Sequence, residues 1–162
     1  MPVLNIHERV LPAPESEVGA LVDGLSGPDD RLWPARAWPR MRLDGPLAVG
    51  ARGGHGPVRY RVVGYQPGRW VRFEFTGPRG FDGFHEFTVQ PAPGGTLLRH
   101  TLAMRTHGAA RLSWPLVFRW LHDALLEDGL DRGVRACGGE VPVPARWGFA
   151  VRLLRTLARR PR

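Results

Sequence analysis

The sequence predicts an α+β fold in which an antiparallel sheet is covered by a long helix near the C-terminus. The first observation is the alternation of apolar and polar residues in four runs between Val58 and Met104. A period of two is typical of strands that bury one face. The second is the segment SWPLVFRWLHDALLEDGLDRGVRA after Gly108, whose apolar residues recur at helical spacing. A half-buried sheet needs a cover, so we expect the core, and any cavity in it, between this helix and the sheet.

The alternation assigns the residues of the four runs to two faces of the sheet. The expected inner face carries apolar side chains and two histidines, while arginine, glutamate and threonine fill most outer positions. Its members are Val58, Tyr60, Val62, Val71, Phe73, Phe75, His85, Phe87, Val89, Leu98, His100, Leu102 and Met104. A four-residue turn between the last two runs would place His85 directly opposite His100 and would pair Glu86 with Arg99 outside.

The long helix has an apolar side with one acidic residue in it. At about 100 degrees per residue, Val117, Phe118, Leu121, Ala124 and Leu125 share an arc, with His122 at its edge. Arg119, Asp123 and Glu127 lie opposite, where Arg119 and Asp123 are spaced for an ion pair. Asp128 falls near the middle of the apolar arc. Because burying an unpaired carboxylate is costly, either a partner reaches Asp128, with His85 and His100 as candidates, or the helix end is open to water.

The N-terminal part contains shorter elements. A strand is expected from Val3 to Val10, followed by a short helix whose first turn holds Pro14 and two glutamates and which ends near Leu25. The segment SGPDDRLWPARAWPRM has two Trp-Pro pairs and is expected to form a short helix or a lid, with Trp33 and Trp38 bordering an opening. The run GARGGHG lacks the Lys-Ser/Thr of a phosphate loop, so we interpret it as a flexible lead to the next strand.

Composition limits the class of protein. A chain of 162 residues is expected to form one domain with a full core. A single cysteine, Cys137, excludes an internal disulfide, and the start MPVLNIHERV has no signal-sequence pattern, so a cytoplasmic location is expected. No apolar run approaches the roughly eighteen residues needed to span a bilayer. Arginine supplies all 23 basic residues, a usage typical of a high-GC genome.

The net charge of +8 does not indicate a nucleic-acid-binding protein, because its distribution is uneven. All 15 acidic residues lie at or before Glu140, so residues 1–144 carry a balance of only +2. Residues 145–162 hold six arginines and no acidic residue. No recognised nucleic-acid-binding motif accompanies this basic tail, and nucleic acid is not an expected partner.

The tail predicts a separate amphipathic helix. Gly138, Gly139, Pro142 and Pro144 mark a break, so we expect a domain over residues 1–137 and a linker with a basic helix over 138–162. Trp147, Ala150, Val151, Leu153, Leu154, Leu157 and Ala158 share one half of the helical wheel, and Arg152, Arg155 and Arg159 the other. The apolar half could dock on its own domain, on a second copy or on a partner protein, or it could lie on an anionic membrane surface. Self-association or membrane contact would use Trp147, Leu153, Leu154 and Leu157.

The order of these elements resembles the START-related helix-grip superfamily, and most of all the bacterial SRPBCC or polyketide cyclase/dehydrase-like proteins. The resemblance rests on PAPESEV, YRVVGYQPGRWVRFEF, FHEFTVQPAPGGTLLRHTL and LHDALLEDGLDR, in that order, and covers about residues 3–136. It implies a helix-grip fold with about seven antiparallel strands around the C-terminal helix, two short helices near the N-terminus and a cavity for an apolar ligand. The segment from Glu140 onward has no counterpart in that pattern.

Two hypotheses about function follow. In the first, the cavity binds a hydrophobic or aromatic small molecule, polyketide- or lipid-like, without changing it. In the second, the chain is a cofactor-free cyclase or dehydratase with His85, His100, Tyr60 and Asp128 as candidate acid-base residues. The expected ligand-binding residues are Val62, Val71, Phe73, Phe75, Phe87, Leu102, Met104, Trp33, Trp38, Leu121, Leu125 and His122. The histidines are open to a plainer interpretation as hydrogen-bonded core residues. No His-x-His or HExxH spacing occurs, so neither a metal nor a cofactor is expected.

Overall fold

The computed structural model describes residues 1–158 and arranges seven strands in one antiparallel sheet. The strands are β1 (Pro2–Leu11), β2 (Arg42–Leu43), β3 (Arg52–His55), β4 (Val58–Gln66), β5 (Trp70–Gly77), β6 (Phe81–Ala92) and β7 (Gly95–Thr106). Strands β2 to β7 follow one another across the sheet, and β1 pairs with β7 at the far edge. The predicted α+β class and the seven-stranded antiparallel sheet are confirmed.

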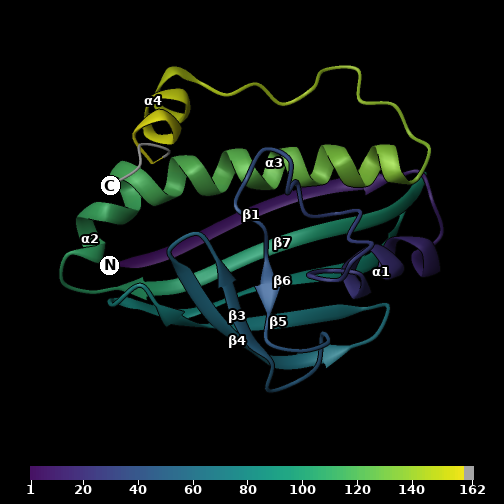
Figure 1. The fold of residues 1–162 in the computed structure, drawn as a ribbon. Coiled ribbons are helices and arrows are strands. Elements are labelled where there is room, and N and C mark those ends of the chain that lie inside the picture. Colours follow the sequence, from purple (N-terminus) through teal and green to yellow (C-terminus); the bar gives the residue numbers. More distant parts are fainter. Residues whose placement is uncertain (159–162) are drawn as a thin grey trace.

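One long helical segment lies across the sheet (Figure 1). It consists of α2 (Ala110–Ser113), a π-helical turn at Trp114–Phe118 and α3 (Arg119–Ala136), which follow one another without a break. Pro115, in the π-helical turn, has no N–H to donate, which suits a local change in the helical hydrogen bonds. After α3 the chain runs back along the helix, so that α4 (Phe149–Ala158) lies over the beginning of the long helical segment (Figure 1).

Near the N-terminus the structure has one helix, α1 (Glu15–Asp23), and not the expected two. Residues 24–41, all of which the structure describes, form turns and bends instead of a second helix. The Asp30 carboxylate accepts hydrogen bonds from the backbone N–H groups of Leu32 and Trp33 at 2.9 and 2.7 Å. Pro34 and Pro39 follow, and each removes a backbone donor that a helix would need. The segment is therefore held by side-chain capping and not by helical hydrogen bonds.

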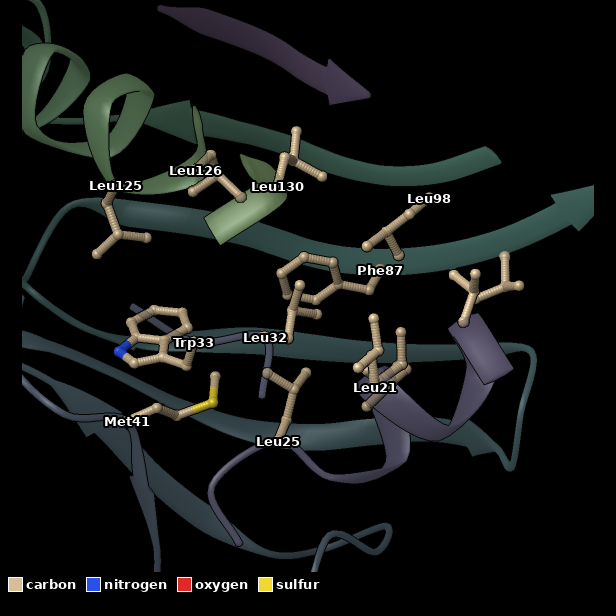
Figure 2. Close-up of a cluster of buried hydrophobic side chains, with 14 of the residues drawn as sticks. Leu21, Leu25, Leu32, Trp33, Met41, Phe87, Leu98, Leu125, Leu126 and Leu130 are labelled. Atoms are coloured by element: carbon tan, nitrogen blue, oxygen red, sulfur yellow. The ribbon is translucent and has the colours of Figure 1, made fainter. Parts of the chain in front are cut away.

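The interior is filled by two groups of side chains. The larger group packs α1, the following turns and the second half of α3 against the sheet; Figure 2 shows Leu21, Leu25 and Leu32 between the sheet and the helix that carries Leu126 and Leu130. The smaller group contains Phe81, Leu102, Met104, Ala110 and Trp114, at the end where the long helix begins. The two ends of the sheet are therefore covered by different elements.

The hairpin between β6 and β7 has a different register from the expected one. Its turn has two residues, Pro93 and Gly94, because Ala92 pairs with Gly95. His100 therefore lies opposite Phe87, and His85 lies opposite Leu102, two positions from the expected pairing. A shift of two positions keeps every side chain on its predicted face, because side chains alternate with that period. Both histidines are buried as expected.

The same shift separates Glu86 from Arg99, so the predicted outer ion pair does not form. Glu86 binds Arg72 of β5 at 2.8 Å, and Arg99 binds Glu8 of β1 at 2.7 Å. Each charged residue thus finds a partner on the strand at its other side.

Helix α1 approaches the turn between β4 and β5 closely. Asp23, at its last position, accepts hydrogen bonds from the Gly68 N–H and from the Tyr65 hydroxyl at 2.9 and 3.0 Å. A Cβ atom on Gly19 would lie 2.6 Å from Gly68 Cα, a distance that heavy atoms do not tolerate. Glycine at position 19 therefore sets how near the helix can come to the sheet.

None of the helices within residues 1–158 combines the length and the apolar character that crossing a bilayer requires.

Candidate ligand-binding site

A cavity of about 370 Å³ lies between the sheet and the first half of the long helical segment. Its wall is mostly apolar and aromatic, with histidines as the main polar groups. The turn segment, the sheet and the helices contribute Trp33, Trp38, Pro39, His55, Pro57, Val58, Phe75, Phe81, His85, His100, Leu102, Trp114, Phe118, Leu121, His122, Leu125, Leu126 and Arg155, among others. A volume of this size is within the range of small-molecule pockets in proteins.

The cavity wall includes part of the residue set that the sequence indicated for ligand binding. Those present are Trp33, Trp38, Phe75, Leu102, Leu121, His122 and Leu125. Val62, Val71, Phe73, Phe87 and Met104 also face inward, but they belong to the packed core instead of the wall. Side chains from α1 and the following turns, such as Leu21 and Leu25, fill the space over much of β4, β5 and β6. Alternation predicts the inner face but not which part of that face is already covered.

Tyr60 lies behind the wall. Its hydroxyl is 3.2 Å from His55 Nδ1, and its ring packs edge-on against His85 and Phe73. Burial raises the pKa of Tyr60 well above its usual value, in spite of the charge of Arg59. Tyr60 therefore contacts two of the four histidines that line the cavity, His55 and His85, without lining it itself.

Asp128 does not meet His85 or His100. Its Oδ2 atom accepts hydrogen bonds from two indole N–H groups, Trp38 Nε1 at 2.7 Å and Trp147 Nε1 at 2.8 Å. The partner that a half-buried carboxylate requires is therefore supplied by the turn segment and by the C-terminal segment. An acid-base pairing of Asp128 with the two histidines is wrong in this geometry.

His85 and His100 form a buried pair within the cavity wall. His100 Nε2 and His85 Nδ1 are 3.2 Å apart, and the His85 ring stacks on Phe73. Burial, followed by the charges of neighbouring histidines, holds the pKa of both rings well below the usual value, so both are neutral at pH 7. Among the described residues, His85 Nε2 and His100 Nδ1 have no hydrogen-bond partner. The pair therefore keeps two nitrogen atoms available.

His55 is a cavity residue that the sequence interpretation missed. It ends β3, inside the glycine-rich run that we interpreted as a flexible lead, and its ring lies 4.7 Å from that of Trp33. Burial, then the charges of His122 and Arg59, lower the pKa of His55 to about 3. The available signal was the tight turn before Val58, because a hairpin at that turn pairs His55 with the inward-facing Val58.

The C-terminal segment closes over one side of the cavity through Arg155. Its guanidinium lies between the rings of Trp38 and Trp147, at 4.3 and 3.9 Å from their centroids, and donates to the Ala37 carbonyl. Val151 is buried beside it. The tail therefore docks on its own domain, and Arg155 is buried although the helical wheel placed it on the polar half. We call Trp38, Asp128, Trp147 and Arg155 the latch.

The exposed side of α4 carries apolar residues. Phe149, Leu153 and Leu157 are 82%, 48% and 51% exposed. Arg159, which the wheel placed on the polar half, lies outside the described residues.

The fold and the cavity together define a helix-grip protein, in which a curved antiparallel sheet and a long helix enclose a pocket. The family model described as polyketide cyclase/dehydrase and lipid transport matches residues 7–138. The chain belongs to this family, as its sequence resemblance implied. The match ends just after α3, so the linker and α4 lie beyond it. Comparison with curated proteins gave no match.

Solved structures with the same fold come from bacteria and plants. Norcoclaurine synthase from Thalictrum flavum, in complex with dopamine and hydroxybenzaldehyde, aligns with a TM-score of 0.59 at 12% identity and covers 85% of this chain and 84% of its own. A Thermobifida fusca protein aligns with a TM-score of 0.59 at 19% identity, over 85% of this chain and 93% of its own. CalU16 from Micromonospora echinospora aligns with a TM-score of 0.57 at 17% identity, over 97% and 83%. At these identities the similarity establishes the fold.

Proposed function

We propose that the chain binds a small hydrophobic molecule with aromatic or polyene character, polyketide- or lipid-like, in the cavity. The observation that carries this proposal is the pocket itself: about 370 Å³, with tryptophan and phenylalanine side chains over much of its wall. Burying apolar surface against such a wall is favourable by about 25 cal/mol per Å². Norcoclaurine synthase, with the same fold, holds aromatic molecules in its complex, which supports an aromatic ligand here.

The test is native mass spectrometry of the purified protein, with extraction and identification of any co-purifying compound, followed by titration with the fluorescent probe anilinonaphthalene sulfonate. Leu121→Trp fills the cavity and is expected to weaken probe binding at least tenfold. The matched control is Leu116→Trp on the same helical segment, where the side chain is 66% exposed. Equal probe affinity in both variants would refute binding in the cavity.

A second candidate function, catalysis of enolisation in a cyclase or dehydratase reaction, is favoured by the His85–His100 pair. One proton lies between the two neutral rings, so of their two other nitrogen atoms one is an N–H donor and the other has a free lone pair. The lone pair can remove a proton from carbon next to a ligand carbonyl while the N–H protonates the carbonyl oxygen. Transfer of the shared proton then converts each ring to its other tautomer, and no net charge forms in the apolar cavity.

The two functions differ in what the histidines must do. In a carrier, His85→Gln and His100→Gln are expected to change ligand affinity by less than about tenfold. In an enzyme, either change should abolish deuterium incorporation into a bound aryl β-diketone, measured by NMR in D₂O, while binding persists, since glutamine has no basic nitrogen. If the wild-type protein binds the diketone but exchanges none of its protons, the enzyme hypothesis is refuted and only the carrier function remains.

We also propose that the exposed side of α4 contacts an anionic membrane surface. Phe149, Leu153 and Leu157 are spaced four residues apart, and the exposed Arg152 lies among them. Apolar residues flanked by arginine are typical of helices that lie in the membrane interface. Trp147, expected to take part in such contact, instead packs on its own domain.

A further inference from the structure

The polar side of α3 lies along the edge strand β1. Asn5, His7 and Arg9 of β1 meet Asp123, Glu127 and Asp131 of α3. Apart from the histidines, Arg9 and Arg119 supply two positive charges, and Asp123, Glu127 and Asp131 supply three negative charges. Burial lowers the pKa of His7, but hydrogen bonds and charges from Asp123 and Glu127 raise it overall, so the seam between β1 and α3 favours a positive charge at His7, either a proton or a metal ion.

Three potential metal-ligand atoms converge in this seam. His7 Nε2 is 3.1 Å from Asp123 Oδ1, and His122 Nδ1 is 3.6 Å from the same oxygen. The ligand atoms of these three residues all lie within 4.8 Å of one another. Bonds of about 2.0–2.1 Å to a tetrahedral ion separate neighbouring ligand atoms by about 3.3 Å, so the observed distances on Asp123 lie on either side of that value.

His122 lacks the hydrogen bonds that a buried imidazole requires. Its side chain is 16% exposed, and among the described residues neither ring nitrogen has a hydrogen-bond partner. The 3.6 Å separation from Asp123 is too long for a hydrogen bond. A metal ion bound to Nδ1 would satisfy one of the two nitrogens. Nε2 would then carry the ring proton and could donate a hydrogen bond to a ligand in the adjoining cavity.

The surroundings of His7 orient its imidazole for metal binding. Glu127 Oε1 is 2.8 Å from His7 Nδ1, so an N–H at that position donates to the carboxylate. Nε2 faces Asp123 Oδ1 at 3.1 Å, and a metal ion would take the place of the proton at this nitrogen. A carboxylate behind a histidine ligand is a recurrent arrangement at metal sites. Asn5 Nδ2 donates to Asp123 Oδ1 at 2.9 Å and orients the third group.

We propose that His7, His122 and Asp123 bind a divalent transition-metal ion, zinc or ferrous iron, at the seam between β1 and α3. Two imidazoles and one carboxylate suit either ion, and a three-residue set leaves a position for water. His7 lies more than a hundred residues from its two partners in the sequence, so no short spacing motif could reveal the site. The proposal is independent of the cavity ligand.

The experiment uses the untagged full chain, stripped with a chelator and titrated with Zn²⁺ by calorimetry and with Co²⁺ by absorption spectroscopy at neutral pH. We expect one ion per chain at micromolar or tighter dissociation constant. His7→Gln and Asp123→Asn should each weaken binding at least tenfold, and Glu127→Gln should weaken it to a smaller degree. His107→Gln is the matched control, because His107 also lies 3.6 Å from an aspartate, Asp82, but both side chains are exposed.

Two results would overturn the proposal: no saturable binding at millimolar Zn²⁺, or equal losses in the His107→Gln control and the His7→Gln variant. Circular dichroism and melting curves establish that each variant is folded. If a ligand variant does not fold, the imidazole nitrogen NMR signals of wild-type protein decide instead. Added Zn²⁺ should move the signals of His7 and His122, and movement confined to other histidines would refute the site.

Discussion

Buried neutral imidazoles are the unusual residues of this molecule. His55 lies against Trp33 and Tyr60, and its pKa is lowered to about 3 by burial and then by the charges of His122 and Arg59. An unfolded chain binds a proton at this residue near pH 6.5. The folded state thus excludes a proton that the unfolded state accepts.

This difference predicts a loss of stability at acid pH. Where the unfolded state binds more protons than the folded state, stability decreases as the pH is lowered. His55 therefore leaves stability unaffected above pH 6.5 and reduces it progressively as the pH falls from 6.5 toward 3. Urea unfolding across this range should give a steeper decline for wild type than for His55→Gln. His107→Gln, at an exposed position, should follow the wild-type curve. Parallel curves for wild type and His55→Gln would contradict the assignment.

Sequence patterns predicted the faces of individual residues better than their partners. Tyr60, Phe73, His85 and His100 are buried as the alternation indicated. Asp128 was recognised as needing a partner, but the partners are two indoles, and one of them, Trp147, lies beyond the long helix. The periodicity of a sequence pattern predicts the direction in which a side chain leaves the backbone. The hydrogen-bond partner of that side chain depends on how distant segments are arranged in the fold.

Among the elements, α1 depends on a close approach that only glycine permits. Gly19→Ala should raise helix propensity yet destabilise the protein by about 1–3 kcal/mol, because the added methyl group would overlap the Gly68 backbone. Gly148→Ala is the matched control, since a Cβ atom there meets open space. The comparison is made by chemical denaturation. A stabilised Gly19→Ala variant would show that α1 can move away from the sheet at little cost.

Helix α4 depends on the latch. Asp128→Ala leaves the N–H groups of Trp38 and Trp147 without their acceptor, and leaving buried donors unpaired costs about 1–3 kcal/mol each when no water replaces it. Hydrogen exchange should increase in residues 149–158 far more than in the sheet. Glu140→Ala, at an exposed acidic position, serves as control and should change neither. Uniform acceleration throughout the chain would mean that Asp128 stabilises the whole core instead.

The elements themselves were largely predictable, and turns were the exception. Strands β4 to β7 and the long helix followed from period alone, but the number of residues in the β6–β7 turn did not. Pro93 and Gly94 make a two-residue turn where a longer one was expected, which moved the register by two positions. The glycine-rich run before Val58 has no side-chain alternation to read, so β3 and its histidine were missed.

At the scale of the whole molecule, the tail forms part of the cavity wall, and we expect it to slow ligand exchange. Arg155 and Trp38 belong to the cavity wall, and Arg155 comes from α4. A chain ending at residue 138 should keep the helix-grip fold but release a bound fluorescent ligand at least tenfold faster in stopped-flow displacement. Arg155→Met, which retains an apolar chain without the guanidinium, should show a smaller acceleration. An unchanged release rate in the truncated chain would show that the tail does not limit ligand exchange.

Membrane contact is tested on the intact molecule as well. Wild-type protein should co-sediment with phosphatidylserine vesicles more than with phosphatidylcholine vesicles, because arginine near an anionic surface gains about 1 kcal/mol. Replacing both Leu153 and Leu157 by glutamate should abolish this preference and leave the melting temperature unchanged, since both side chains are about half exposed. Sedimentation of the double variant equal to that of wild type would contradict the proposed surface.

The docked tail has a consequence for how selectivity can diversify in this family. The family pattern ends at residue 138, whereas Arg155, part of the cavity wall, is encoded after it. Mutation of the last segment can therefore change the cavity wall without changing the residues of the sheet and the long helix. Two relatives with the same helix-grip fold but different C-terminal segments would then be expected to bind different molecules. Exchanging these segments between them would be a direct way to transfer ligand preference.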